Sequence, residues 1–248
     1  MSSSTISLIV FVCVFGGALL GILLHAVLPH HHLTSETKDI VKVGMGFVGT
    51  MSALVLGLLV ASAKNSYDTQ GAELTQLSAN IALLDRGLAF YGPETKETRA
   101  LLRDVLVRFH NQMWSKDAAS RSAQPSGGEM LYEKIHGLAP KNDTQRSIQS
   151  QALSLLVDIG KTRLLMYEQA TGAVSLPLLV VLVLWLSVIF ISFGLYAPFN
   201  ATAVSSLFLA ALSVSGAIFL ILEMYTPYEG LVQISDAPVR AVLANLGR

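Results

Sequence analysis

The sequence of 248 residues has little charge, because only 14% of its residues are Asp, Glu, Lys or Arg, whereas 52% are hydrophobic. The 17 basic and 17 acidic residues balance to a formal net charge of zero, so the overall charge gives no reason to expect a nucleic-acid partner. This composition is too apolar for an ordinary soluble domain. It points to a lipid bilayer as the surroundings of part of the chain.

Cysteine is nearly absent, and the sequence motifs of common enzymes are missing. The single cysteine, Cys13, has no partner for a disulfide within the chain, and we interpret it as a packed apolar thiol. The sequence contains no phosphate-binding glycine loop, no nucleophile elbow and no zinc-binding helix motif. We therefore expect no enzymatic activity, no catalytic residue and no cofactor.

Residues that bind metal ions form only one cluster, at His30, His31 and His32. Three adjacent histidines in an extended loop cannot all face one ion, and no neighbouring Cys, Asp or Glu completes a site. We therefore predict no metal site.

Four long stretches without Asp, Glu, Lys or Arg dominate what the sequence does contain. Each has about 20 residues, which at about 1.5 Å per helical residue is enough to span a hydrocarbon core of about 30 Å. Backbone groups in lipid need internal hydrogen bonds, so these stretches should be helices. The chain is predicted to be an all-α, polytopic membrane protein with spans at residues 8–28, 43–63, 176–196 and 201–222.

The spans divide the chain into four regions. We predict a transmembrane hairpin over residues 1–63, a helical cytoplasmic bundle over 64–172, a second hairpin over 173–222 and a C-terminal tail over 223–248. Four spans place both termini and the bundle on one side, and the basic residues close to the membrane favour the cytoplasm for that side. We expect the tail to lie on the bundle or on a neighbouring subunit.

The bundle is expected to consist largely of extensions of the second and third spans. No proline interrupts the sequence from Val43 to Tyr91, so one continuous helix is predicted there, ending at Gly92 and Pro93. Its polar part carries apolar residues at alternating spacings of three and four. A hydrophobic stripe in a bundle and a coiled coil both fit this spacing. The residues concerned are Leu74, Leu77, Ile81, Leu84 and Leu88.

Small residues recur every fourth position in the first two spans. Such spacing lets helix backbones approach closely, which is how membrane helices gain packing contacts. Packing within one subunit and assembly of several subunits around an axis are both compatible with it. The residues are Gly17 and Gly21 in the first span, and Gly49, Ala53, Gly57 and Ala61 in the second.

Charged groups inside the spans would indicate an ion-coupled transporter, because such groups are costly in lipid and commonly form proton relays. The predicted spans contain none, which argues against this class. A pore with an apolar constriction remains compatible with the sequence.

Two collinear segments, Gly57–Thr95 and Phe193–Leu243, resemble the bestrophin-like family of bacterial membrane proteins. That family resembles, at a distance, the bestrophins, which are pentameric anion channels with four membrane helices per subunit, cytosolic termini and a helical vestibule. The resemblance implies a homo-oligomeric ion channel of the bacterial inner membrane, with a pentamer favoured, and we expect this channel to prefer anions. It also implies that the second membrane helix lines the pore.

Candidate pore-lining residues follow from this resemblance. They are Thr50, Ser52, Leu56 and Leu59 in the second span, with Lys64 at its cytoplasmic mouth. A ring of lysines would raise the local concentration of anions. The alternative function is a non-conducting scaffold or sensor that binds a protein partner through the cytoplasmic bundle.

The sequence departs from bestrophins at the calcium site. Bestrophins hold calcium in a clasp of acidic residues, and Ser235 with Asp236 alone does not make one. Members of the bestrophin-like family tend to have an acidic or amide residue where this chain has Tyr225. The chain thus departs from the family pattern at this position, and a role carried over from the family does not apply to Tyr225 directly.

Overall fold

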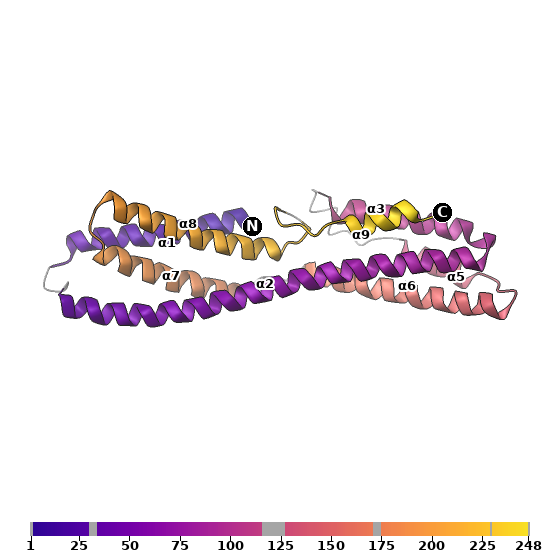
Figure 1. Cartoon of the computed structure of the whole chain (residues 1–248), viewed down its shortest axis with the longest axis horizontal. Coiled ribbons are helices and arrows are strands. Elements are labelled where there is room, and N and C mark those ends of the chain that lie inside the picture. Colours follow the sequence, from indigo (N-terminus) through magenta and orange to yellow (C-terminus); the bar gives the residue numbers. More distant parts are fainter. Residues whose placement is uncertain (1, 30–33, 116–126, 171–174, 229, 248) are drawn as a thin grey trace. The chain divides into compact units, whose positions relative to one another are not determined.

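The computed structural model describes residues 2–29, 34–115, 127–170, 175–228 and 230–247, and none of these residues lies in a β-strand (Figure 1). The all-α prediction is confirmed. The helices are α1 (Ser3–Val27), α2 (Ser35–Tyr91), the short 3-10 helix η2 (Pro93–Thr95), α3 (Lys96–Met113), α5 (Gly128–His136), α6 (Asp143–Ala170), α7 (Leu176–Tyr196), α8 (Ala201–Met224) and α9 (Ala237–Asn245).

The chain forms two compact units, and each is described by itself. The apolar unit comprises Met1–Asn65 and Ala173–Tyr225, and the bundle unit comprises Ser66–Gly172 and Thr226–Arg248. Helix α2 contributes residues to both. Two features of the sequence analysis, the histidines at 30–32 and the boundary at Gly172, lie outside the described residues.

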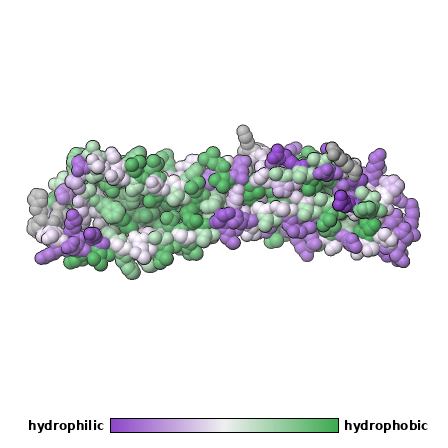
Figure 2. Space-filling model, in the orientation of Figure 1, coloured by the Kyte–Doolittle hydropathy of each residue, from purple (hydrophilic) through white to green (hydrophobic). Residues whose placement is uncertain are grey.

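The apolar unit contains the four predicted spans. Among the described residues, α1, α2, α7 and α8 are the helices long and apolar enough to cross a membrane, which confirms a membrane protein. Apolar side chains cover most of the visible surface of this unit in Figure 2. So much exposed apolar surface requires a non-aqueous surrounding. Helix α7 has the predicted bounds, whereas α2 begins at Ser35 rather than Val43, and α8 ends at Met224 rather than Leu222.

Close contact between α1 and α7 is made possible by glycine. A Cβ atom added at Gly17 would lie 3.1 Å from the Ser187 carbonyl oxygen, and one added at Gly21 would lie 2.8 Å from the Leu195 amide nitrogen. These neighbours are backbone atoms, so they cannot move aside as a flexible side chain could. His25, further along α1, hydrogen-bonds the Leu195 carbonyl oxygen at 2.8 Å and fixes this end of the pair. The two helices therefore pack backbone against backbone.

The bundle unit has a core built around the apolar stripe of α2. Leu74, Leu77, Leu84 and Leu88 are fully buried, and Ile81 is 5% exposed. They share one cluster with apolar side chains of α3, α5, α6 and the C-terminal segment. In this chain, the stripe thus packs against the helices of its own bundle.

Helix α2 ends where Gly92 turns the chain back. Gly92 has a φ of 139°, a value that residues with a side chain rarely adopt, and Pro93 then opens η2. The Thr95 hydroxyl donates to the carbonyl oxygens of Leu88 at 2.5 Å and Gly92 at 2.8 Å. These bonds satisfy carbonyl groups left over at the helix end and direct α3 back along α2.

The C-terminal segment packs on the same bundle. Tyr228, Ile234, Val239 and Leu246 belong to its core cluster. The Trp114 indole nitrogen donates to the Ile234 carbonyl oxygen at 3.2 Å.

A polar contact fixes the same segment beside α3. The His110 Nε2 atom donates to the Asp236 carboxylate at 3.0 Å, and Arg240 contacts the same carboxylate at 2.8 Å. The hydrogen bond from His110 lowers the pKa of the Asp236 carboxyl, which keeps it charged. Helix α9 is thereby held against the bundle.

Candidate functional site

Helix α2 is the membrane helix with the least contact inside its own chain. Within the most apolar window of each helix, 11% of the α2 residues are buried, compared with 39% in α1, 33% in α7 and 22% in α8. Helix α2 therefore presents most of its membrane-spanning surface to lipid or to another molecule. This surface is the candidate functional site.

The exposed surface of α2 carries a stripe of small residues. They recur at spacings of three and four, so they lie on one side of the helix. A Cβ atom added at Gly46 or Gly57 would meet nothing within 4 Å. We call this set the small-residue stripe: it consists of Gly46, Thr50, Ala53, Gly57 and Ala61, and it ends at Lys64.

Large apolar side chains lie directly beside this stripe. Phe47 is 71% exposed, Leu54 66% and Leu58 59%. Large apolar side chains are suited to contact with lipid. A row of small residues instead leaves a shallow groove along the helix, into which another helix can pack. Lipid contact alone explains the large side chains but gives no reason for the small ones.

The predicted pore-lining residues divide between two faces of α2. Thr50 and Lys64 are exposed, Leu56 is half-buried, and Ser52 and Leu59 are only 4% and 2% exposed. Leu59 belongs to the core that α2 shares with α1, α7 and α8. The structure therefore does not bring the five residues together on one surface.

Hydroxyl groups on both faces bond to their own helix. Thr50 donates to the Gly46 carbonyl oxygen at 3.0 Å, and Ser52 donates to the Val48 carbonyl oxygen at 2.8 Å. Each hydroxyl thus satisfies its donor within α2 and keeps lone pairs free to accept. On the exposed face, only Thr50 can offer these to a passing or neighbouring group.

The predicted packing residues also fall into two groups. Gly17 and Gly21 contact α7, whereas the exposed residues of the second span have open space in front of them. Gly49 is half-buried, with nothing within 4 Å of an added Cβ, and Ala53, Gly57 and Ala61 are exposed. The same sequence spacing therefore marks an occupied contact in α1 and an unoccupied surface in α2.

The sequence analysis did not predict that Glu223 and Tyr225, at the end of α8, belong to the candidate site around α2. The Tyr225 hydroxyl donates to the Ser62 hydroxyl at 3.0 Å and ties the end of α8 to α2. Glu223 is 5% exposed, although its charge led the sequence analysis to end the fourth span before it. The continuing apolar sequence on either side of Glu223 was the signal that the helix extends past it.

Charge is sparse on the exposed face of α2. From Gly46 to Ala61 the stripe is uncharged, and Lys64 is its single charged residue. Within the described parts of the chain, no group of three or more His, Cys, Asp or Glu side chains is placed to hold a metal ion. The surface can thus offer close packing, one hydroxyl and one positive charge.

Comparison with known families identifies a relationship that covers most of the chain. The model of a family described as the Bestrophin-like domain matches residues 11–239. No curated protein and no solved structure matches the chain.

Proposed function

The chain belongs to the bestrophin-like family, and from this premise we propose that it forms a homo-oligomeric ion channel and is not an enzyme. The observation that carries the proposal is the small-residue stripe of α2, whose residues are exposed and which has nothing within 4 Å of a Cβ added at Gly46 or Gly57. A membrane helix that leaves such a stripe open is suited to pack closely against copies of itself around an axis.

The proposed setting is the bacterial inner membrane, with five subunits in the ring. Both termini and the bundle unit would lie in the cytoplasm. The basic residues near the spans support this orientation through the positive-inside rule. Family membership is compatible with a channel, and the number of subunits follows from the resemblance to bestrophins alone.

The proposed pore lining is the part of the exposed α2 surface that faces the axis. We assign Thr50 and Lys64 to this lining and Gly57 to the contact between neighbouring α2 helices, whereas Ser52 and Leu59 are left out of the proposal because they are buried in the chain's own core. An uncharged lining selects ions by width and by charges at its mouth. Lys64 would supply a positive ring there and a modest preference for anions.

A non-conducting scaffold or sensor is the second candidate. It is favoured by large exposed apolar side chains in the bundle unit, where Phe90 is 76% exposed and Leu231 83%. Patches of this kind outside a membrane commonly bind other proteins. The two candidates differ in whether the purified protein conducts.

Assembly should depend on the small-residue stripe. We expect Gly57→Leu to shift the solubilised complex to smaller species, because a bulky side chain would separate helices that touch at this stripe. Mass measured by light scattering after size-exclusion chromatography checks this. Gly44→Leu is the matched control, since Gly44 is also in α2 with nothing within 4 Å of an added Cβ but lies off the stripe. Equal masses for wild type and Gly57→Leu would contradict the proposed packing.

Conduction decides between the two candidate functions. We expect the purified protein in planar bilayers to pass current under a chloride gradient. The reversal potential should lie closer to the equilibrium potential of chloride than to that of the cation. Lys64→Glu should move the reversal potential towards the equilibrium potential of the cation, because it reverses the charge at the mouth. Lys64→Arg keeps the charge and should leave the reversal potential unchanged. The shift should weaken at high salt, where the Debye length falls from about 10 Å at 0.1 M to about 3 Å at 1 M. Absence of current at all voltages would favour the non-conducting scaffold or sensor.

A further inference from the structure

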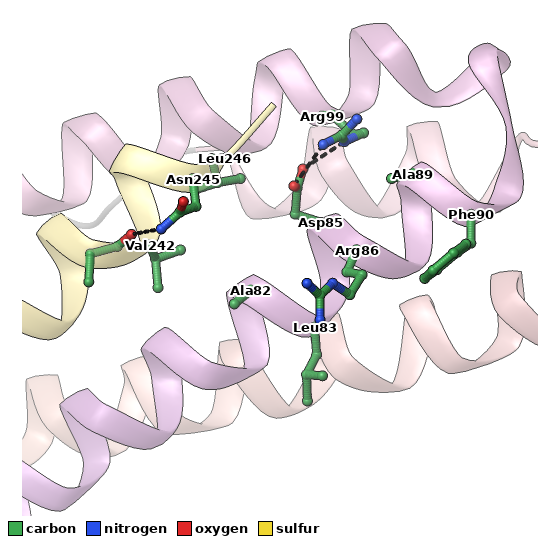
Figure 3. A pocket seen from close by; sticks show the side chains of 11 residues that line it. Ala82, Leu83, Asp85, Arg86, Ala89, Phe90, Arg99, Val242, Asn245 and Leu246 are labelled. Atoms are coloured by element: carbon green, nitrogen blue, oxygen red, sulfur yellow. Dashed lines mark hydrogen bonds and ion pairs between the residues drawn. The ribbon is translucent and has the colours of Figure 1, made fainter. Parts of the chain in front are cut away.

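A groove in the bundle unit lies between α2 and the C-terminal helix α9 (Figure 3). Its volume is about 790 Å³, which is within the range of about 300–1,000 Å³ typical of small-molecule sites. Most of its lining is apolar. The apolar residues are Ala82, Leu83, Ala89, Phe90, Ala241, Val242 and Leu246.

The apolar walls of the groove are unusually open to solvent. Phe90 is 76% exposed and Leu83 57%, although both belong to the bundle unit rather than to the apolar unit. Exposed apolar side chains gathered along a groove commonly mark a binding surface. The groove thus offers contact to an apolar body.

The only carboxylate in the described lining is already neutralised. Asp85 accepts two hydrogen bonds from Arg99, from Nε to Oδ1 and from Nη2 to Oδ2, both at 2.8 Å. This geometry is the strong bidentate form of an arginine–carboxylate pair. The Gly247 amide also donates to Asp85 at 3.5 Å, so this carboxylate is held by several groups.

Arg86 differs from Arg99 because no ion pair to it is present in the described part of the chain. Its neighbours one turn away on α2 are Ala82, Leu83, Ala89 and Phe90, none of which carries charge. In Figure 3 the Arg86 side chain is directed away from the Asp85–Arg99 pair. The groove therefore combines apolar walls with one uncompensated guanidinium.

We infer that this groove binds a small amphipathic monoanion, an apolar body with one carboxylate or similar group that pairs with Arg86. A guanidinium is weakly hydrated and offers a planar fork of donors that matches a carboxylate. Arg86 is exposed in the chain, and the apolar body of the bound ligand would shield the pair from water, which strengthens it. Leu83 and Phe90 provide the contact surface for the apolar body, and α9 closes the opposite side.

Equilibrium dialysis of radiolabelled octanoate tests this inference on the full chain in nanodiscs of phosphatidylcholine. Empty nanodiscs give the amount that partitions into lipid. We expect one saturable site on the wild type and a loss of affinity of about tenfold or more in Arg86→Gln, which removes a charge-assisted hydrogen bond. Arg86→Lys should retain most of the affinity, and the neutral analogue octanamide should bind no better to wild type than to Arg86→Gln.

Two further variants separate the groove from general effects. Arg146→Gln removes an exposed arginine from α6 and should leave octanoate binding unchanged. Ala82→Trp fills the groove without altering charge and should weaken binding. Saturable binding that is equal in wild type and Arg86→Gln would overturn the inference, and so would absence of saturable binding.

A second copy of the chain is the competing occupant of the groove. In a Cys13→Ser background, a Phe90→Cys variant that cross-links between copies, together with absent octanoate binding, would identify that occupant and overturn the small-ligand site. The binding experiment does not require conduction, so its failure leaves the proposed channel function standing.

Discussion

Replacing Leu84 by Asp should unfold the bundle unit. Leu84 is fully buried in the core that α2 forms with α3, α5, α6 and the C-terminal segment. The substitution removes about 2–5 kcal/mol of apolar packing and places an unpaired carboxylate in the same site. Whole domains are stable by only about 5–15 kcal/mol, so we expect a large fall in yield and in the thermal midpoint of the bundle unit. The fluorescence of Trp114, which packs against the bundle core, measures this midpoint.

The neighbouring residue gives the matched control. Leu83 is the same residue type in the same helix, but it is 57% exposed. Leu83→Asp introduces the same charge at the surface, where substitutions usually change stability by less than about 0.5 kcal/mol. If the two variants were equally stable, the bundle core described here would be wrong.

Features controlled by local sequence were predicted well. Hydropathy and length located the four membrane helices, because lipid imposes the same requirement on every spanning segment. The bounds of α7, Leu176–Tyr196, agree with the prediction. Gly92 and Pro93 located the end of α2, because one residue supplies an unusual φ and the other cannot continue the helix.

The orientation of α2 about its own axis could not be predicted from the sequence. A membrane helix is apolar on all sides, so hydropathy does not distinguish the face towards its own chain from the face towards lipid or another subunit. Thr50 and Ser52 are both small hydroxyl residues two positions apart, yet the first is exposed and the second is 4% exposed. The packing of Leu59 and Ala63 with the other helices separates the two faces.

Small-residue spacing has the same limitation. Gly17 and Gly21 in α1 follow the same four-residue spacing as Gly49, Ala53 and Gly57 in α2, and the sequence gives no way to tell which stripe is used within the chain. The structure places α7 against the α1 pair and leaves the α2 stripe open. Contacts within the chain therefore use one stripe, and the other is available for assembly.

Gly21→Ala should strongly destabilise the apolar unit although it adds only one methyl group. The added Cβ would collide with the Ile191 carbonyl oxygen and would lie 2.8 Å from the Leu195 amide nitrogen. Because both atoms belong to the α7 backbone, the two helices would have to separate, and contacts along their whole interface would weaken. Overpacking typically costs about 1–3 kcal/mol, and rigid backbone neighbours place this site at the upper end.

Gly16→Ala is the matched control, since Gly16 is in the same helix and an added Cβ there meets nothing within 4 Å. Alanine is favoured over glycine in a helix by about 1 kcal/mol, so this variant should be as stable as the wild type or slightly more stable. Thermal unfolding of both variants, reconstituted in the same lipid, compares them directly. Equal thermal midpoints for Gly21→Ala and Gly16→Ala would show that α1 and α7 are not in backbone contact, whereas a fall confined to Gly21→Ala would assign this glycine to packing within the chain.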